Sequence, residues 1–258
     1  GDMPRCMLMI GLEYLGHALD DSGEIDNPLA QTDKSACMHI ALLAYDGCVA
    51  SGISGFLDVL AVANHLAGET LFRPQVLSRD GQPVQPFAGP PLQGDGSLGD
   101  ETLPAIWSLA YVPPAFGLTE PDASLVAWLK EAHESGAIAC GACAGVFFLA
   151  AAGLLTGRAA TTHWGLTEAF AAAYPDVRLE PAQMLIDGGD TICAGGLTAY
   201  FDLALHIVAR FAATELAVSC ARVLLLDPGR VRQTPYRTLI APPTHGDALI
   251  LKAQDWLE

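Results

Sequence analysis

Short apolar stretches alternate along the first half of the chain with segments whose apolar residues recur at helical spacing. The apolar stretches end in turns or prolines, which is typical of buried strands: 38–47, 72–81 and 106–114. The segments with helical spacing are 53–68, which stops at a glycine, and 121–136, in which Asp122 is placed to cap the helix. This alternation predicts strand–helix units joined by short loops.

The same alternation continues in the second half of the chain. The segment AIACGACA (137–144) is predicted to be a strand, and a helix follows it over 145–153. Beyond it we expect a polar strand at 159–163, a helix at 164–174, a hairpin at 184–195 and helices at 196–212 and 213–225. Such a pattern predicts a mostly parallel sheet covered on both faces, with ligands bound beyond the carboxyl ends of its strands.

Charge and composition narrow the classes of function. The formal net charge of −16 argues against direct binding of this chain to nucleic acid, because phosphate contact needs a basic face. No uninterrupted apolar run reaches the length of a membrane helix, and 7–19 lacks the cleavage site of a signal peptide. The seven cysteines lie mostly in apolar segments, which favours a reducing, cytoplasmic setting without disulfides.

The stretch around Cys140 and Cys143 allows several interpretations. The sequence GACAG resembles the strand–turn–helix elbow of hydrolases with cysteine as nucleophile, and a helix N-terminus behind it would lower the pKa of the thiol. A buried structural thiol is the alternative. A CxxC redox or zinc site is disfavoured, since no second ligand pair is present at suitable spacing, and we expect neither metal nor cofactor.

Candidate partners for Cys143 are few. No histidine adjoins it, because the next residue is Ala144, so His163 is the remaining candidate base or else a packed, hydrogen-bonded histidine. Asp58 is read either as a site carboxylate or as a helix-start residue. We expect His133 on an exposed helix face and His206 in the core.

A family resemblance rests on CAGVFFLAAAGLLTGRAATTHW (143–164), with further matches at 45–64 and 193–208. This chain resembles the ThiJ/PfpI branch of the class I glutamine-amidotransferase-like superfamily. The segments 213–238 and 245–258 are similar to the region that joins such a domain to a helix-turn-helix module in GlxA-like, AraC-type transcriptional regulators. The resemblance implies a flavodoxin-like three-layer α/β/α sandwich with a C-terminal helical extension, and commonly a dimer.

The chain departs from the catalytic pattern of that family at three places. Ala144 stands where catalytic members have histidine, and Gly52 or a neighbour stands where members with a reactive cysteine have glutamate. The oxyanion loop, usually Pro-Gly-Gly, is Pro113-Pro114-Ala115, and Pro114 has no N–H to donate. These departures favour a pocket that binds a ligand without turnover.

The resemblance predicts three regions: an N-terminal extension of unknown role (1–37), a ThiJ/PfpI-like domain (38–212) and a helical extension (213–258) leading to a DNA-binding module outside this chain. The helix expected at 247–258 has no capping glycine, which indicates that the natural protein continues. The predicted function is ligand sensing and dimerisation in a cytoplasmic AraC-type regulator. Its effector would be a small molecule, and the protein would have no membrane partner.

The pocket is predicted to be formed by residues around the elbow: Cys143, Ala144, Gly145, Pro114, Ala115, His163 and Asp58. One alternative is a cysteine-dependent hydratase or hydrolase of the isonitrile hydratase type, with Cys143 as nucleophile and His163 or Asp58 moving protons. Another is a redox sensor that oxidises Cys143, with Cys140 as the resolving thiol.

Overall fold

The computed structural model describes residues 37–116 and 120–236 and contains a mostly parallel sheet of seven strands. Its strands are β1 (Met38–Leu43), β2 (Phe72–Ser78), β3 (Gly96–Ser97), β4 (Leu109–Val112), β5 (Ile138–Ala142), β8 (Leu185–Asp187) and β9 (Thr191–Ala194). Their order is β3-β2-β1-β4-β5-β9-β8, and only β8 runs antiparallel to its neighbour. The predicted helix at 247–258 and the N-terminal extension lie outside the described residues.

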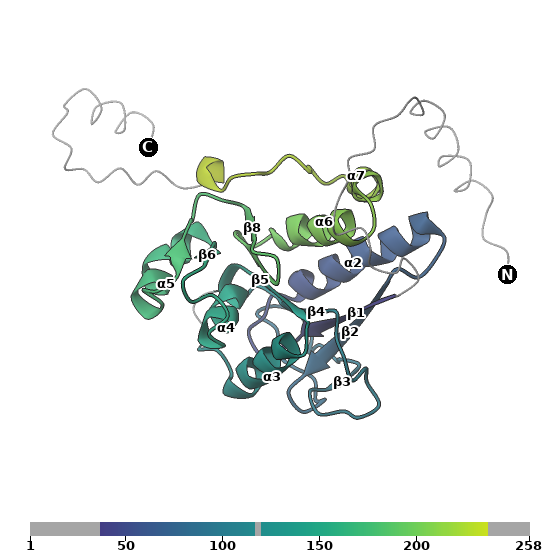
Figure 1. Ribbon diagram of the computed structural model, residues 1–258. Helices are drawn as coiled ribbons and strands as arrows, with labels where there is room; N and C mark the ends of the chain where they lie inside the picture. Colours follow the sequence, from purple (N-terminus) through teal and green to yellow (C-terminus); the bar gives the residue numbers. More distant parts are fainter. Residues whose placement is uncertain (1–36, 117–119, 237–258) are drawn as a thin grey trace, which may run out of the picture. The chain divides into compact units, whose positions relative to one another are not determined.

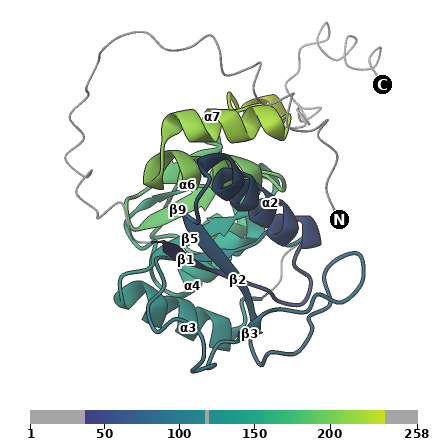
Figure 2. The same ribbon diagram turned by 90° about the vertical axis from the view of Figure 1, so that its right-hand side faces the viewer.

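Helices cover both faces of this sheet. The main helices are α2 (Ala50–Ala67), α3 (Ala123–Glu134), α4 (Val146–Ala151), α5 (Thr167–Ala173), α6 (Tyr200–Phe211) and α7 (Thr214–Val223). Figure 2 shows α7, α6 and α2 above the sheet, with α3 and α4 below it. A small second sheet, β6 (Ala159–Ala160) with β7 (Arg178–Leu179), lies beside α5 (Figure 1). The predicted three-layer α/β/α architecture is therefore confirmed.

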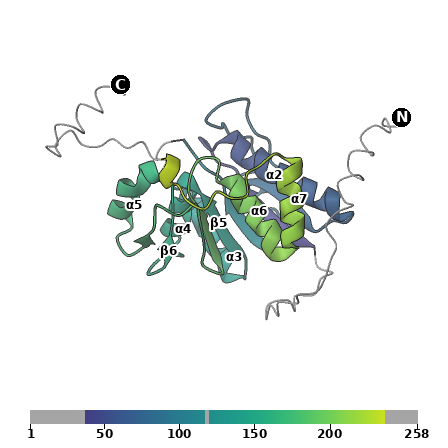
Figure 3. The ribbon, with the colours of Figure 1, turned by 90° about the horizontal axis from the view of Figure 1, so that it is seen from above.

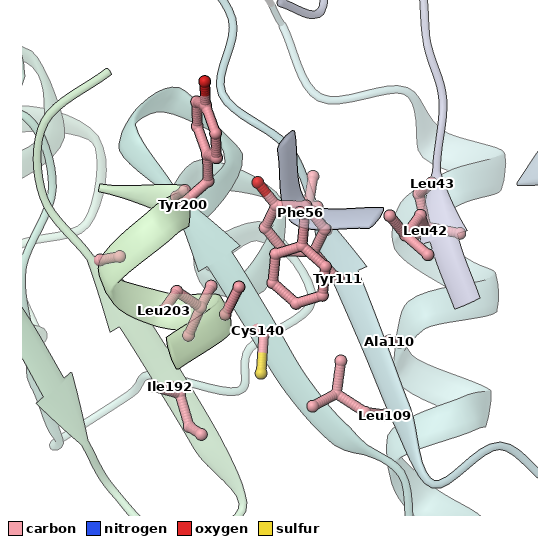
Figure 4. Packing of buried hydrophobic residues seen from close by; sticks show 14 of the residues in the cluster. Leu42, Leu43, Phe56, Leu109, Ala110, Tyr111, Cys140, Ile192, Tyr200 and Leu203 are labelled. Atoms are coloured by element: carbon pink, nitrogen blue, oxygen red, sulfur yellow. The ribbon is translucent and has the colours of Figure 1, made fainter. Parts of the chain in front are cut away.

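The core lies between the sheet and the helices of each face. On the α2/α6 face, Phe56 of α2 stacks on Tyr111 of β4 with ring centroids 4.3 Å apart. Figure 4 shows this pair beside Cys140 of β5 and Leu203 of α6. Burial of each such large apolar side chain contributes roughly 1.5–3 kcal/mol to the stability of the fold. This packing holds the strands that carry the elbow in place.

Most predicted elements are present, and their ends differ. Asp122 caps α3, because its carboxylate accepts hydrogen bonds from the amides of Ser124 and Leu125. Helix α6 starts at Tyr200 and not at residue 196, because 195–199 forms a turn over Gln233. The strand expected at 159–163 is only two residues long, and β3 was not predicted, since two residues are too short for a periodicity.

Two histidine predictions were wrong. His206 lies on α6 among apolar residues, yet its side chain is 32% exposed and its Nε2 lies 2.7 Å from Asp187 Oδ2. His133 is largely covered, with an exposed side-chain fraction of 17%. Its Nδ1 lies 3.0 Å from the carbonyl oxygen of Ala137, and its Nε2 lies 3.4 Å from Asp190 Oδ2. Both errors arise because the hairpin carboxylates that bind these rings are distant in sequence.

Helix α2 is the one helix in the described part of the chain that is long and apolar enough to cross a membrane, by length and composition alone. In this structure its buried side chains, including Phe56 and Leu60, belong to the hydrophobic core. Helices α6 and α7 pack against it. Figure 3 shows these three helices side by side, as expected for a core helix of an α/β domain.

The β8–β9 hairpin is attached to both faces of the sheet by its two aspartates. Asp187 accepts hydrogen bonds from Arg210 of α6 at 2.9 and 3.0 Å and contacts His206. Asp190 pairs with Arg158 on the other side. Burial alone would raise the pKa of Asp187, but the hydrogen bonds from His206 and Gly189 and the charge of Arg210 outweigh it and lower the pKa.

We expect Asp187→Asn to lower the free energy of unfolding by about 1–3 kcal/mol at pH 7, because hydrogen bonds to a charged group are lost. A carboxylate with a lowered folded pKa stabilises the protein above its unfolded pKa and loses that effect as pH falls through the folded pKa. The difference from wild type should therefore shrink below about pH 4. Urea denaturation from pH 3 to 7 measures this, with Glu134→Gln in an exposed pair as control.

Candidate functional site

The elbow predicted at Cys143 is present. Strand β5 ends at Ala142, and Cys143–Gly145 form a single 3₁₀ turn before α4. Cys143 has φ +54°, a left-handed conformation that costs a non-glycine residue about 1 kcal/mol or more. Gly145 is required here, since a Cβ atom would lie 2.7 Å from the carbonyl oxygen of Pro113 and would also clash with that of Val112. The backbone of the turn at Gly145 therefore lies directly against the end of β4.

Burial controls the chemistry of the thiol. Only 3% of Cys143 is exposed. Burial raises the pKa of this thiol to about 12, and the hydrogen bond from the Ala144 amide lowers it only in part. The amide at the turn lowers the pKa of the thiol, as expected, but loss of hydration outweighs it. The neutral thiol is the state present near pH 7.

The loop after β4 begins with two residues that cannot donate a hydrogen bond to an oxyanion. Pro113 and Pro114 have no amide hydrogen, and their carbonyl oxygens accept hydrogen bonds from Tyr45 Oη (2.8 Å) and from the amide of Val49 (2.8 Å). Gly52 packs against this loop, where a Cβ atom would lie 2.5 Å from Pro114 Cδ. A glutamate at position 52 would not fit beside Pro114. Gly52 in place of glutamate and Pro114 in the oxyanion loop are thus two parts of one steric arrangement.

His163 lies next to the elbow but uses one ring nitrogen for structure. Its Nδ1 accepts a hydrogen bond from the Gly165 amide at 3.0 Å, and its ring packs on Trp164 at 5.0 Å. Partial burial lowers the pKa of His163, so the ring is neutral near pH 7. The neighbouring Thr162 donates its hydroxyl to the carbonyl oxygen of Cys143 at 2.7 Å. The structure thus connects His163 to Cys143 through the neighbouring Thr162, whose side-chain hydroxyl makes the bond.

The other candidates are placed as follows. Ala144, Gly145, Pro114 and Ala115 are buried around Cys143, and Ala115 pairs with Cys48 in an antiparallel bridge. Asp58 is exposed in the middle of α2, so it is not a helix-start residue, and no described hydrogen bond or ion pair joins it to the elbow. Its role in the site stays a prediction.

Cys140 points into the core on the α2/α6 face, where it is completely buried (Figure 4). Its pKa is raised well above that of a free thiol, first by burial and then by Cys193. The six cysteines in the described part of the chain are all free thiols. Among the described residues, no group of three or more histidine, cysteine or acidic side chains is arranged to hold a metal ion.

A cavity of about 450 Å³ lies away from the elbow, between α3 and the crossover before β4. Trp107 and Trp128 form part of its wall, with ring centroids 6.2 Å apart, and Glu131 lies at its edge. None of the lining residues belongs to the predicted site. The elbow itself is almost covered, so space for a ligand there depends on movement of the surrounding loops.

Sequence reasoning missed two residues beside the elbow, Tyr45 and Gln233. Gln233 is 1% exposed and lies on the segment after α7, far from Cys143 in sequence. Its amide nitrogen donates to the carbonyl oxygen of Thr162 at 2.8 Å, and its amide oxygen accepts from Trp164 N at 3.2 Å. No local pattern marks it, because its partners are mainly backbone atoms from other parts of the chain.

Comparison with known proteins agrees with this fold. The DJ-1/PfpI family profile matches residues 118–210. Over 200 residues the chain is 35% identical to the HTH-type transcriptional regulator CdhR of Pseudomonas aeruginosa, covering 77% of this chain and 58% of the regulator. It is 29% identical over 203 residues to the HTH-type transcriptional regulator GbdR of the same species, covering 77% and 53%. The chain thus spans little more than half of the length of these relatives.

A solved structure shares the fold. The crystal structure of an AraC family transcriptional regulator from Pseudomonas putida superimposes with a TM-score of 0.64 at 24% identity, covering 72% of this chain and 99% of that one. At that identity the likeness is one of fold.

We expect Cys143 to be nearly inert towards iodoacetamide at pH 7, since a pKa of about 12 leaves roughly one thiolate in 10⁵ molecules. Its alkylation should be on the order of 10³-fold slower than that of a free cysteine and should rise about tenfold per pH unit up to pH 10. Peptide mass spectrometry measures this, with partly exposed Cys37 as internal reference. A rate that levels off near neutral pH would contradict it.

Proposed function

Because this chain belongs to the DJ-1/PfpI family, we propose that it is the ligand-sensing and dimerising domain of an AraC-type transcriptional regulator. The resemblance to helix-turn-helix regulators along most of the chain supports this proposal. DNA would be bound by a module beyond residue 258, since the chain spans little more than half of the relatives' length and carries a net charge of −16. The protein would act in the cytoplasm as a homodimer.

The division of the chain follows from this proposal. Residues 38–212 would form the sensing domain and 213–258 the connection to the DNA-binding module, with 1–37 as an added N-terminal segment. The described part of the connection begins with α7, which packs on α2 and α6. A helix held against the sensing domain in this way is suited to carry a change in that domain to whatever follows it.

The observation that carries the proposal is an elbow whose strained turn persists without the groups needed for turnover. Cys143 has the left-handed backbone of a nucleophile elbow, but burial raises the pKa of its thiol to about 12. Pro113 and Pro114 supply no N–H groups, and Nδ1 of His163 already accepts a hydrogen bond from Gly165. A small molecule bound beside Cys143, Ala144 and Ala115 would meet a neutral, mostly apolar surface. Such a surface is suited to recognition.

Ligand binding should change the affinity of the full-length regulator for its operator, because a ligand that prefers one conformation shifts the population towards it. A metabolite panel is first screened by thermal shift on this chain. A true effector at 100 times its Kd stabilises by about 2.7 kcal/mol, or roughly 5–10 °C in Tm. Fluorescence anisotropy with operator DNA then measures the change in affinity. Stabilising ligands that leave operator affinity unchanged would contradict the proposal.

One observation favours the second candidate, a cysteine-dependent hydratase or hydrolase. The left-handed backbone at Cys143 is costly, and enzymes of this kind use such strain to present a nucleophile. In this alternative Cys143 would attack the substrate, with His163 or Asp58 moving protons. Isonitriles and acyl compounds are the substrates to assay, and turnover lost in Cys143→Ser but kept in Cys220→Ser would establish the enzyme in place of the sensor.

A further inference from the structure

The segment after α7 is bound across the domain close to the elbow. We call residues 227–236 the strap. In Figure 3 it runs from the end of α7 over α6 towards α5. Its backbone pairs with the segment before β8: Gln233 N donates to the carbonyl oxygen of Ala182 at 2.9 Å, and Met184 N donates to that of Val231 at 3.1 Å. The strap is therefore joined to the domain by an isolated antiparallel bridge between Gln183 and Arg232.

Arg230 attaches the strap to α6. Its guanidinium pairs with the carboxylate of Asp202, and the two side chains are only 23% and 12% exposed. It also donates to the carbonyl oxygen and the hydroxyl of Thr198, each at 3.2 Å. Burial raises the pKa of Asp202, while the charge of Arg230 acts in the opposite direction. A carboxylate buried to this degree needs its partner, so release of the strap would leave it unpaired.

Gln233 inserts its side chain into a slot beside the elbow. Its amide nitrogen donates to the carbonyl oxygens of Thr162 (2.8 Å) and Gln183 (3.0 Å). Its amide oxygen accepts from the backbone amides of Trp164 (3.2 Å) and Gly196 (3.1 Å). Donor and acceptor atoms of this amide are thus both satisfied, as a buried amide requires. Gly195 makes room for the amide, since any Cβ at that position would overlap it.

The position of these bonds links the strap to the candidate site. Gln233 binds the residues on both sides of His163, namely Thr162 and Trp164. Thr162 in turn donates its hydroxyl to the carbonyl oxygen of Cys143 at 2.7 Å. A ligand that moves His163 or the Cys143 turn must therefore alter the bonds of Gln233. Loss of those bonds would remove the partner of the part-buried Trp164 amide and leave the Thr162 carbonyl oxygen with only a long bond, 3.5 Å, from the Thr161 hydroxyl.

We propose that Gln233 is a positioning residue that couples occupancy of the Cys143 elbow to the docking of the strap. This inference rests on the proposed function, because the strap is part of the proposed connection to the DNA-binding module. The coupling is reciprocal: release of the strap loosens the elbow, and a ligand at the elbow weakens or strengthens the docking of the strap. Couplings of this kind change affinities on the order of 5–150-fold.

Hydrogen exchange measured by mass spectrometry on the 258-residue chain tests the coupling without effector or DNA. Gln233→Leu keeps a similar volume and removes every hydrogen bond of the side chain. We expect amide exchange in the strap, in 159–166 and in 141–149 to become at least tenfold faster, while α3 stays unchanged. Arg232→Gln, an exposed neighbour in the same strap, is the matched control and should leave all four regions as in wild type.

Faster amide exchange in the strap with unchanged exchange in the elbow would overturn the proposal. An equal acceleration of exchange in α3 would also overturn it, because Gln233 would then have a purely structural role. If Gln233→Leu does not fold, Arg230→Met releases the strap at its other attachment, and the elbow must still exchange faster.

In the full-length regulator, Gln233→Leu should bind effector but lose the change in operator affinity. If the operator affinity of the wild type responds to an effector but exchange in the elbow and in the strap proves uncoupled, this inference fails and the proposed function stands. Coupled exchange in a protein whose operator affinity responds to no ligand would contradict the proposed function alone.

Discussion

The close approach of Gly145 to the carbonyl groups that end β4 is the constraint on which the candidate site depends. Only a residue without Cβ fits there, and the chain between β5 and that position passes through a left-handed residue, Cys143. In the same turn the Cys143 side chain is buried. The position, the strain and the burial of Cys143 thus go together with one backbone contact.

Burial and the turn act on the thiol in opposite directions, and burial dominates. The amide of Ala144 favours the thiolate, but removal of water raises the pKa of Cys143 to about 12. Pro113 and Pro114 of the loop opposite add no N–H donors. In the proposed function, an elbow of this shape serves as a recognition surface that lacks the groups needed for turnover. The steric fit between Gly52 and Pro114 shows that these two residues depend on each other.

The fold could be predicted from the sequence because each strand–helix unit carries its own periodicity, from 38–47 to the hairpin at 184–195. The elbow could be predicted from GACAG for the same local reason. His206 was misplaced because its partner, Asp187, is distant in sequence. Gln233 left no signal, since it binds mainly backbone groups that only the folded chain brings together.

In the proposed function, the elbow recognises a ligand without using the thiol as a nucleophile. Effector-dependent operator binding by the full-length protein carrying Cys143→Ser measures this directly. We expect the variant to bind effector and to change operator affinity nearly as the wild type does, because no covalent step involves the sulfur. A variant that still binds effector but no longer changes operator affinity would rule out recognition without chemistry, since signalling would then require a reaction at Cys143.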